Sequence, residues 1–488
     1  MTLIKSIAGV RGTIDTNDFE GLSTKEIIKC VDQFVSWLFK KYFNQSREIS
    51  REGPHGIILI GRDGRKSGER ISSLISERLR VFSFHVLDLG NTTTPSVQMA
   101  ILTEHGIGGI MISASHNPGN WNGLKLLNVK GEFLSKKESE EVFNSEIKIS
   151  IRGDRGYTYG KFEQLSTGWG ELLSYKEKHI SSVLNLPQVD LVGIPEKKFK
   201  IVVDGINSSG GIYVPYLLKK LGVEVIELNC ICNGEFSHDP EPIPENLTQL
   251  SDKVKETKAD MGIAVDPDVD RLVFVCEDGS FFGEEYTIVA VVKYILTGGS
   301  MGQTDTKVNV VSNLSTTQAV RDVVHSFGGQ HFESAVGEIN VVELMKEKKA
   351  IIGGEGSGGV IFGPLHYGRD ALVGIALFLS YLVKVNLSLT ELKMSLPSYF
   401  MLKEKVFLPE GCEFDYDSFL SKHIKICKQN NQRFLLVDGI KIFYPSGWVH
   451  IRKSNTEPLI RLIIESNNKE QLDLLKKTLI NDIKNYLI

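Results

Sequence analysis

Short apolar runs alternate with amphipathic segments along most of this chain, and that alternation restricts the folds open to it. In the first third, Ile57–Gly61, Phe84–Leu89 and Ile107–Ser113 have the composition of buried strands, and segments with helical periodicity lie between them at Ser67–Arg80 and Pro95–Glu104. Strands that alternate with helices are typical of α/β layers built on parallel or mixed sheets. We therefore predict an α/β fold.

The same alternation occurs twice more before the C-terminal region. It surrounds the strand-like runs Phe199–Asp204 and Met261–Val265, and later Val308–Val311 and Ala350–Gly353. Nearer the end, β-favouring runs dominate and one amphipathic segment, Lys469–Tyr486, closes the chain. A chain of 488 residues is also too long for one core, because single cores stop growing near about 250–300 residues. The sequence predicts three α/β domains with mixed sheets, 1–158, 159–283 and 284–390, followed by a C-terminal α+β domain, 391–488.

Composition is that of a globular protein and excludes several functions. The 56 basic and 60 acidic residues give a net charge of -4, whereas nucleic-acid-binding proteins usually carry a basic excess, so no nucleic-acid partner is expected. The apolar stretch Thr287–Leu296 contains Lys293 and is shorter than the roughly 20 residues of a membrane span. Met1–Gly12 lacks the apolar core of a signal peptide. The six cysteines are scattered, which is typical of reduced thiols. We expect a cytoplasmic protein with no membrane partner.

The most polar turn of the first domain follows an apolar run, Gly106–Ile112. Its sequence is Ser113-Ala114-Ser115-His116-Asn117-Pro118-Gly119-Asn120-Trp121-Asn122-Gly123-Leu124-Lys125. A buried strand that ends in a tight polar turn is a common way to hold one reactive side chain at a surface. Ser115, beside His116, is therefore the candidate nucleophile. An esterase would need an acid partner and an oxyanion site, and the sequence indicates neither.

Three carboxylates follow the strand-like run Met261–Val265, in Asp266-Pro267-Asp268-Val269-Asp270-Arg271. Positions two apart in an extended segment face the same way, so the three carboxylates converge. Converging carboxylates repel one another, and a hard divalent cation such as Mg²⁺ offsets their charge with oxygen ligands. A solvated acidic turn is the alternative. The likeness to an EF-hand opening is superficial, because Arg271 stands where that loop needs glycine.

A glycine-rich loop, Gly353-Gly354-Glu355-Gly356-Ser357-Gly358-Gly359, contains a formal G-x-G-x-x-G. A dinucleotide site requires that this motif open a helix, but a strand-like run follows, so we reject that interpretation. Glycines allow a ligand to approach the backbone closely, and Glu355 and Ser357 would offer it hydrogen-bonding groups, which suits a polyol such as a sugar. A flexible hairpin turn is the alternative.

A donor-rich loop lies near the C-terminus, in Arg452-Lys453-Ser454-Asn455-Thr456-Glu457-Pro458-Leu459-Ile460-Arg461. Guanidinium groups, hydroxyls and backbone N–H groups together suit a phosphate, and a solvated basic loop is the alternative. By contrast, Gly61-Arg62-Asp63-Gly64-Arg65-Lys66-Ser67 looks like a P-loop but lacks its spacing, and we assign it no phosphate-binding role.

Taken in order, these motifs resemble those of the α-D-phosphohexomutase family. They are S-A-S-H-N-P with N-G-x-K, then D-P-D-x-D-R, then G-E-x-S-G and then R-x-S-N-T-E-P. That family includes phosphoglucomutases, phosphomannomutases and phosphoglucosamine mutases. The resemblance spans the whole chain and extends to Gly61-Arg62-Asp63, Thr94-Pro95 and Gly368-Arg369-Asp370. It implies a heart-shaped, four-domain enzyme, monomeric or homodimeric, with its active site in a central cleft.

The resemblance also implies a role for each motif. Ser115 would be the phosphoserine, and its phosphate oxygen would join Asp266, Asp268 and Asp270 in holding one Mg²⁺ per subunit. Glu355 and Ser357 would contact sugar hydroxyls. The non-reacting phosphate would be held by Arg452, Ser454, Asn455, Thr456 and Arg461. Supporting roles near the transferring phosphate would fall to Arg11, His116, Lys125 and Arg271, with His116 or Lys125 carrying the proton.

These roles imply a two-step exchange. Phospho-Ser115 would give its phosphoryl group to a hexose monophosphate, the resulting hexose 1,6-bisphosphate would turn over in the cleft, and its other phosphate would return to Ser115. Gly359 stands where many family members have histidine, and the G-E-G-x-G-G loop is more similar to mutases assigned to glucosamine phosphate. We therefore predict interconversion of glucosamine 6-phosphate and glucosamine 1-phosphate. The alternatives are a phosphoglucomutase or phosphomannomutase, a non-catalytic sugar-phosphate sensor, and a magnesium phosphatase.

Overall fold

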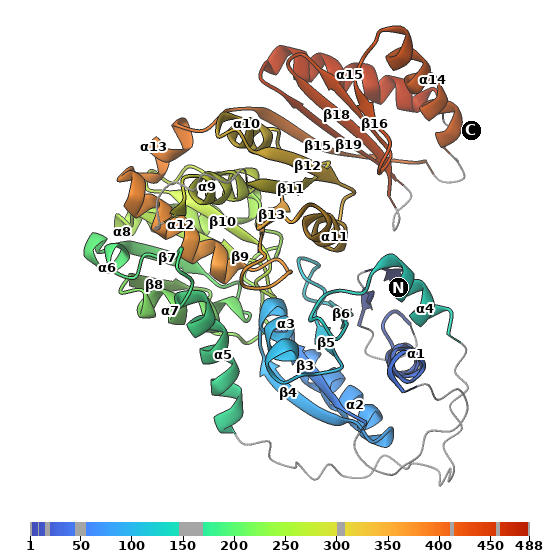
Figure 1. Ribbon diagram of the computed structural model, residues 1–488, viewed down its shortest axis with the longest axis vertical. Helices are drawn as coiled ribbons and strands as arrows, with labels where there is room; N and C mark the ends of the chain where they lie inside the picture. The colour runs from blue at the N-terminus through green and yellow to red at the C-terminus, as the bar shows by residue number, and fades with distance from the viewer. Residues whose placement is uncertain are drawn as a thin grey trace.

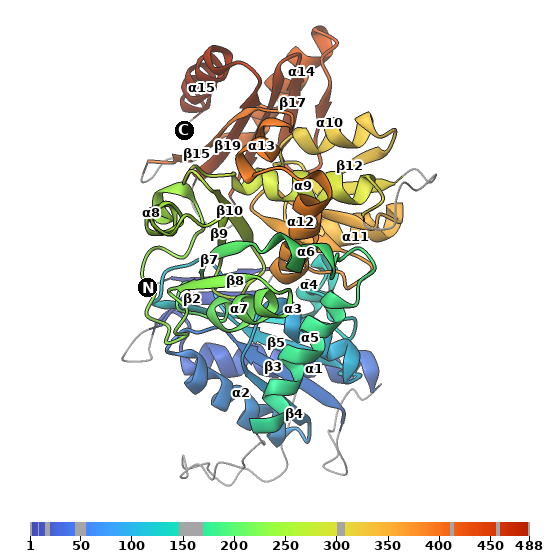
Figure 2. The ribbon, with the colours of Figure 1, turned by 90° about the vertical axis from the view of Figure 1, so that its left-hand side faces the viewer.

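The computed structural model describes residues 2–7, 9–14, 20–43, 55–145, 169–299, 308–409, 414–454 and 459–486. In these ranges the strands form four sheets. Figure 1 shows them in an arc, from the N-terminal sheet at the bottom, through the middle two on the left, to the C-terminal sheet at the top right. The view turned by 90° shows the same succession along the long axis (Figure 2). None of the described helices is long and apolar enough to cross a membrane.

The first sheet is mixed and has helices on both faces. Its strands, in spatial order, are β1 (Leu3–Ser6), β2 (Gly9–Thr13), β6 (Trp121–Leu127), β5 (Gly108–Ile112), β3 (Ile57–Arg62) and β4 (His85–Asn91). Its helices are α1 (Thr24–Tyr42), α2 (Gly68–Val81), α3 (Thr94–Thr103) and α4 (Lys136–Phe143). Because side chains alternate between faces along a strand, Ile58 and Ile60 share a core with α1 and α2, whereas Leu59 packs with α3 on the other face.

The second and third sheets have related layouts: in each, one antiparallel strand lies at the edge of an otherwise parallel set. The second contains β10 (Leu272–Cys276), β9 (Met261–Val265), β7 (Lys200–Asp204) and β8 (Glu224–Leu228), with α5 (Trp169–Leu184), α6 (Gly193–Lys197), α7 (Gly210–Lys220), the short helix η1 (Pro244–Asn246) and α8 (Thr248–Thr257). The third contains β12 (Gln330–Ser334), β11 (Asn309–Asn313), β13 (Ile352–Glu355) and β14 (Gly359–Phe362), with α9 (Glu284–Leu296), α10 (Ala319–Ser326), α11 (Glu338–Lys348), α12 (Ala371–Val385) and α13 (Leu389–Met394).

A single hydrophobic core joins the second and third sheets. It contains strand residues of both, and α12 contributes buried side chains along most of its length. Helix α12 begins at Asp370, whose carboxylate accepts hydrogen bonds from the backbone N–H groups of Leu372 and Val373. This cap fixes the start of the helix, and it therefore also fixes the residue just before the cap, Arg369.

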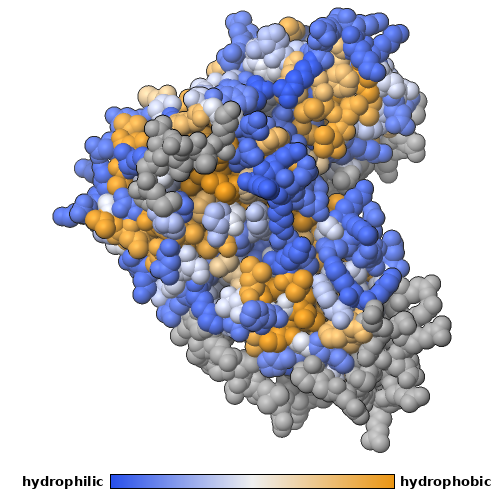
Figure 3. Space-filling model, in the orientation of Figure 1, coloured by the Kyte–Doolittle hydropathy of each residue, from blue (hydrophilic) through white to orange (hydrophobic). Residues whose placement is uncertain are grey.

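The C-terminal unit is a purely antiparallel sheet covered by two helices. Its strands, in spatial order, are β15 (Phe400–Phe407), β19 (Leu459–Ser466), β18 (Gly447–Lys453), β17 (Ile440–Tyr444) and β16 (Phe434–Leu435), and its helices are α14 (Tyr416–Gln429) and α15 (Lys469–Lys484). The space-filling view is hollowed on its right-hand side, between this unit and the N-terminal one (Figure 3). The predicted architecture of three α/β units with mixed sheets and a C-terminal α+β unit is confirmed. The predicted first boundary, at residue 158, lies outside the described residues.

Candidate active site

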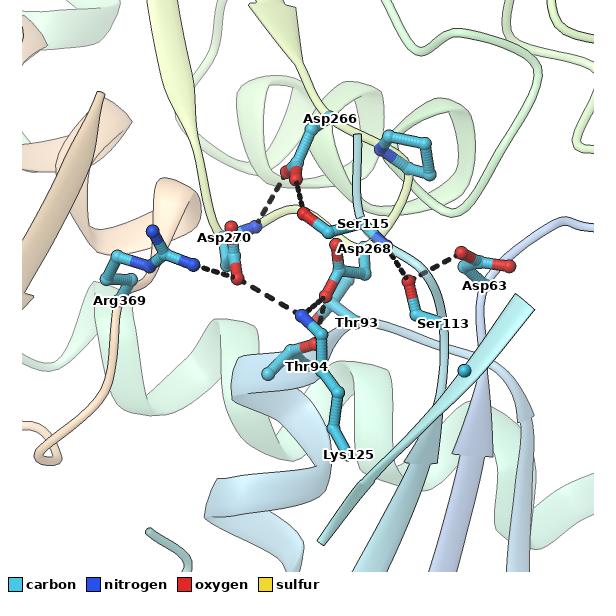
Figure 4. A network of polar contacts seen from close by, with 12 residues as sticks. Asp63, Thr93, Thr94, Ser113, Ser115, Lys125, Asp266, Asp268, Asp270 and Arg369 are labelled. Atoms are coloured by element: carbon cyan, nitrogen blue, oxygen red, sulfur yellow. Dashed lines mark hydrogen bonds and ion pairs between the residues drawn. The ribbon is translucent and has the colours of Figure 1, made fainter. Parts of the chain in front are cut away.

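Ser115 lies just after β5 and is held from two sides. Strand β5 is buried throughout, and the chain turns at Ser115, whose φ of 49° lies in the left-handed region. The backbone N–H of Ser115 donates to Ser113 Oγ at 2.8 Å, and its hydroxyl donates to Asp266 Oδ2 at 2.7 Å (Figure 4). Such a backbone costs about 1–3 kcal/mol and persists only where its surroundings fix it. Ser115 is thus a fixed hydroxyl, 8% exposed, facing a carboxylate of the second unit.

Arg65 holds the loop that follows Ser115. Its guanidinium is fully buried and uses all five of its N–H groups. Nε donates to Asp63 at 3.0 Å, Nη2 to the carbonyls of Ser115 and Asn117 at 2.5 and 2.6 Å, and Nη1 to the carbonyls of Pro118 and Trp121 at 2.6 and 3.0 Å. Asp63 also accepts the Ser113 hydroxyl at 2.6 Å. Arg65 and Asp63 therefore fix both the turn at Ser115 and the residues after it.

Asp266, Asp268 and Asp270 converge at the carboxyl end of β9. All three are fully buried, and one carboxylate oxygen from each lies within 4.8 Å of the others. Within the described parts of the chain, Oδ1 of Asp268 and Oδ1 of Asp270 are buried and have no hydrogen-bond partner. Buried carboxylate oxygens without donors need a compensating charge, and an all-oxygen set suits a hard cation. The residues therefore fit a magnesium ion.

Positive charge is already fixed on one side of these aspartates (Figure 4). Lys125 Nζ lies 2.5 Å from Asp268 Oδ2 and 3.4 Å from Asp270 Oδ2, and Arg369 Nη2 lies 2.7 Å from Asp270 Oδ2. At the start of α3, the Thr94 hydroxyl donates to the Asp268 carboxylate, and the Thr94 N–H donates to the Asp268 carbonyl at 3.0 Å. The first and third units thus both contact the Asp266–Asp270 loop of the second.

The pKa shifts follow this uneven distribution of charge. Burial, with Asp270 and Asp268 nearby, raises the pKa of Asp266 well above its usual value. Burial opposes ionisation of Asp270 as well, but Arg369 and Lys125 outweigh it and hold the pKa of Asp270 below its usual range. Burial disfavours the charged form of Lys125, yet Asp268 and Asp270 raise its pKa overall, so its ammonium stays charged at neutral pH. Lys125 and Arg369 thus lie against Asp268 and Asp270, whereas Asp266 accepts the hydroxyl of Ser115.

Glu355 is the last residue of β13 and is anchored at both oxygens. Oε1 accepts from Asn313 Nδ2 at 2.7 Å and from the Gly337 N–H at 3.0 Å, and Oε2 accepts from Arg369 Nη1 at 2.8 Å. Ser357 lies half-buried in the turn that leads into β14. As the sequence predicts, a strand follows this glycine-rich loop rather than a helix. The carboxylate of Glu355 is thus preorganised in an otherwise glycine-rich hairpin.

The fourth motif brings two arginines together in the C-terminal sheet. Arg452 of β18 and Arg461 of β19 are directly paired across the strands, so their side chains share a face. Burial lowers the pKa of Arg452, and Arg461 adds to this effect, while Asp438, 3.9 Å away, opposes it. Two like charges side by side favour a bound anion. Ser454 is buried beside them, whereas the predicted Asn455 and Thr456 lie outside the described residues.

The remaining predicted residues surround the Ser115 loop. Arg11 Nη1 donates to Asn117 Oδ1 at 3.1 Å, and the Arg271 backbone N–H donates to Asp266 Oδ1 at 3.1 Å. The charge of Arg271, then burial and the charge of Arg11, lower the pKa of His116 well below its usual value, so its imidazole is neutral at pH 7. Residues far apart in the sequence therefore gather around one serine.

Four domain descriptions of one family match successive parts of this chain. They are the alpha/beta/alpha domains I, II and III of phosphoglucomutase/phosphomannomutase, over residues 8–150, 177–279 and 283–400, and the C-terminal domain, over residues 422–481. A phosphoglucomutase/phosphomannomutase of Thermococcus kodakarensis is 32% identical over 432 residues, which cover 87% of this chain and 89% of the relative. This chain belongs to the phosphohexomutase family. It is therefore an isomerase of the phosphotransferase type.

Other relatives of this phosphohexomutase carry different substrate names. A probable phosphoglucosamine mutase of Methanopyrus kandleri is 30% identical over 434 residues, covering 88% of this chain and 90% of the relative. Among solved structures, a phosphoglucomutase/phosphomannomutase family protein of Burkholderia thailandensis aligns with a TM-score of 0.77 at 22% identity, covering 98% of this chain and 96% of the other. N-acetylphosphoglucosamine mutase of Aspergillus fumigatus, in complex with GlcNAc-6P and magnesium, aligns at 0.58 and 14% identity, covering 99% and 95%. Both structural likenesses establish the fold.

The sequence motifs assign no role to three residues that lie in this site. Arg65 belongs to a segment without P-loop spacing, and four of its five acceptors are backbone carbonyls, which no side-chain motif indicates. Thr94 and Arg369 belong to the short similarities Thr94-Pro95 and Gly368-Arg369-Asp370, which carry no function by themselves. Neighbouring sequence does not indicate their roles, because the contact of Thr94 with Asp268 and that of Arg369 with Asp270 cross between units.

Proposed function

We propose that this phosphohexomutase moves a phosphoryl group between O6 and O1 of a hexose monophosphate through phospho-Ser115, and that glucosamine 6-phosphate and glucosamine 1-phosphate are its substrates. The observation that carries the proposal is the contact between Ser115 Oγ and Asp266 Oδ2 at 2.7 Å. It sets a rigid hydroxyl of the first unit against a buried carboxylate cluster of the second. This arrangement suits a residue that carries a phosphoryl group beside a cation.

Charge and positioning are what such a transfer requires. Asp266, Asp268 and Asp270 would hold the Mg²⁺, which when bound offsets the negative charge of the phosphoserine and the aspartates. Lys125 keeps a second positive charge beside Asp268, and Arg11 and Arg271 add theirs near the Ser115 loop. The anchoring of that loop by Arg65 keeps the phosphoryl group in one place. His116 and Lys125 are the two candidates to carry the proton of the sugar hydroxyl.

The exchange has two halves. In the first, the sugar hydroxyl attacks phosphorus, the bond from phosphorus to Ser115 Oγ breaks, and a hexose 1,6-bisphosphate forms, while the hydroxyl proton passes to a base and a proton is returned to Ser115 Oγ. In the second, the Ser115 hydroxyl gives its proton to the base and attacks the other phosphate of the turned-over bisphosphate. The bond from that phosphorus to the sugar oxygen breaks, the sugar oxygen takes up the proton, and phospho-Ser115 and the product monophosphate form. Glu355 and Ser357 would hold the sugar, and Arg452, Ser454, Asn455, Thr456 and Arg461 would hold the phosphate that does not react. Because either phosphate must fit there, the paired arginines suit the task.

The choice of glucosamine phosphate is supported by the loop that ends in Gly359 and by relatives named for that substrate. Among these, the Methanopyrus kandleri protein is named a probable phosphoglucosamine mutase, and a phosphoglucosamine/phosphogalactosamine mutase of Sulfurisphaera tokodaii is 28% identical over 438 residues. A competing name, phosphoglucomutase/phosphomannomutase, belongs to the Thermococcus kodakarensis relative. The second candidate function is therefore a mutase of glucose or mannose phosphates.

A panel of hexose phosphates tests both candidates. The purified protein would be assayed for isomerisation of glucosamine, glucose and mannose 6-phosphates with Mg²⁺ and trace hexose 1,6-bisphosphate. We expect the highest kcat/KM for glucosamine 6-phosphate and no activity in Ser115→Ala, while Ser181→Ala, an exposed serine of α5, stays active. A preference for glucose or mannose would reject the substrate, and absence of any turnover would reject the function. Release of inorganic phosphate instead would indicate a phosphatase.

A further inference from the structure

Arg369 joins three carboxylates from two units of the protein. Its Nε lies 3.0 Å from Glu338 Oε2, its Nη1 lies 2.8 Å from Glu355 Oε2 and its Nη2 lies 2.7 Å from Asp270 Oδ2. We infer that Arg369 is a positioning residue that couples two loops: the Glu355–Gly359 loop, proposed to bind the sugar, and the Asp266–Asp270 loop, proposed to bind the metal. This inference rests on the proposed function. The proposed mechanism uses Glu355 and Asp270 and gives Arg369 no role.

The burial of this cluster makes the guanidinium hard to replace. The side chains of Asp270, Glu338 and Glu355 are at most 7% exposed, and that of Arg369 is 12% exposed. Removing one partner of a buried ion pair leaves the other charge uncompensated, which is far more damaging than losing a surface pair. A planar fork can serve three carboxylates in fixed directions, whereas a lysine offers a single point charge.

The backbone on either side of Arg369 is fixed, so its side chain has a fixed origin. The Arg369 N–H donates to Glu338 Oε1 at 3.2 Å, and residue 369 forms a β-bridge with Ile361 of β14. The next residue, Asp370, caps α12, and its Oδ2 lies 2.9 Å from His179 Nε2. A side chain that starts from such an anchored segment can hold its partners to a fraction of an ångström.

Gly359 gives independent support, because its lack of a side chain makes room for Arg369. A Cβ placed on Gly359 would lie 2.3 Å from Arg369 Cδ, closer than van der Waals contact allows. The arginine stem therefore lies across the end of the Glu355–Gly359 loop, in the space that a side chain at residue 359 would occupy. The glycine at 359 and the contacts of Arg369 are thus two parts of one arrangement.

Among the described residues, the ion pairs of Glu355 comprise one partner, Arg369. Asn313 and the Gly337 N–H hold Oε1, while Arg369 holds Oε2 and, through Nη2, fixes the distance to Asp270. Without Arg369, Glu355 would lose its orientation toward the sugar, and Asp270 would lose a counter-charge. Both substrate affinity and turnover should then fall together.

The first test compares Arg369→Gln and Arg369→Lys with Arg80→Gln, an exposed arginine at the end of α2. We expect Arg369→Gln to lower kcat/KM for glucosamine 6-phosphate by about 10- to 100-fold, through a higher KM and a lower kcat together. Arg369→Lys should have a kcat/KM between those of Arg369→Gln and the wild type, and Arg80→Gln should have the kcat/KM of the wild type. A role in folding alone would reduce the active fraction, which lowers kcat and leaves KM unchanged.

A binding measurement separates the inference from the proposed function. Isothermal titration calorimetry with glucosamine 6-phosphate would be done on the Ser115→Ala variant in EDTA, so that neither phosphoryl transfer nor bound metal contributes to the measured affinity. We expect the Ser115→Ala, Arg369→Gln double variant to bind about 10-fold more weakly than Ser115→Ala alone. If the wild type shows neither turnover nor binding, the proposed function fails. If the wild type is active, and Arg369→Gln has the KM of the wild type and leaves the calorimetric affinity unchanged, the positioning role is overturned.

Gly359→Ala keeps the proposal testable if the Arg369 variants fold poorly. The added methyl group should displace the arginine stem and raise KM about 10-fold in the wild-type background. An Arg369→Ala protein lacks the Cδ atom that the added methyl group would overlap, so Gly359→Ala should have little further effect in that background. A Gly359→Ala protein with the KM of the wild type, or one equally impaired with and without Arg369, contradicts the arrangement.

Discussion

Replacing Arg65 by methionine would remove five hydrogen bonds from the loop that holds Ser115. Four of the acceptors are backbone carbonyls of residues 115, 117, 118 and 121, and the fifth is Asp63, whose carboxylate would stay buried without its charged partner. Breaking a buried ion pair in this way costs about 3–5 kcal/mol. For a unit of this size, each kcal/mol shifts the unfolding midpoint by about 2–4 °C, so we expect a shift of about 6–20 °C.

The matched control for this prediction is Arg62→Met, at the end of β3. Arg62 pairs with Asp88 across 3.9 Å near the surface, and such a pair contributes about 0–1 kcal/mol. Thermal unfolding followed by calorimetry would compare the two variants, and the phosphoryl content of Ser115 would be read by intact-mass spectrometry after exposure to hexose 1,6-bisphosphate. Arg65→Met should lose both stability and phosphorylation. Equal unfolding midpoints for the two variants would refute the reasoning from buried hydrogen bonds.

Three further outcomes follow from the same contacts. Asp268→Asn should lower isomerisation by more than about 100-fold at each Mg²⁺ concentration of a titration, because removing a residue that merely orients a metal ligand already costs up to about 100-fold. Arg452→Gln should raise KM about 10- to 100-fold with a smaller change in kcat, since in the proposed mechanism Arg452 would give a charged hydrogen bond to the phosphate that does not react. Burial raises the pKa of Glu465 to about 7 in the folded protein, above its value of about 4.3 in an unfolded chain. The protonated carboxyl therefore stabilises the fold fully below about pH 4.3, and this contribution is lost as the pH rises from there to about 7. Glu465→Gln should therefore show a smaller fall in unfolding temperature between about pH 5 and pH 8 than the wild type or the surface variant Glu404→Gln.

Local patterns in the sequence were sufficient for the elements that carry the site. The run before Ser113 is strand β5, the run before Asp266 is strand β9, and a strand rather than a helix follows Gly359. Each of these rests on periodicity and on a turn at a known position, which are properties of neighbouring residues. The separate motifs could also be assigned to one site, because the family resemblance supplied their order.

Contacts between units could not be predicted in the same way. Nothing in the sequence near α12 indicates that one core runs through both the second and third sheets, because an apolar helix looks the same whichever sheet it packs on. The bonds from Arg65 to carbonyls depend on the path of the backbone after Ser115. The contact of Thr94 with Asp268 joins segments 174 positions apart. These interactions depend on how finished layers pack against one another.

The transfer of a labelled phosphoryl group from Ser115 to substrate is the most direct test of the central claim. The protein would be labelled with radioactive hexose 1,6-bisphosphate, freed of excess reagent and mixed with an equimolar amount of glucosamine 6-phosphate in Mg²⁺. We predict that the label leaves Ser115 and appears first in glucosamine 1,6-bisphosphate and then in glucosamine 1-phosphate, and that Ser115→Ala takes up no label. Label that stays on the protein, or that is released only as inorganic phosphate, would contradict the account.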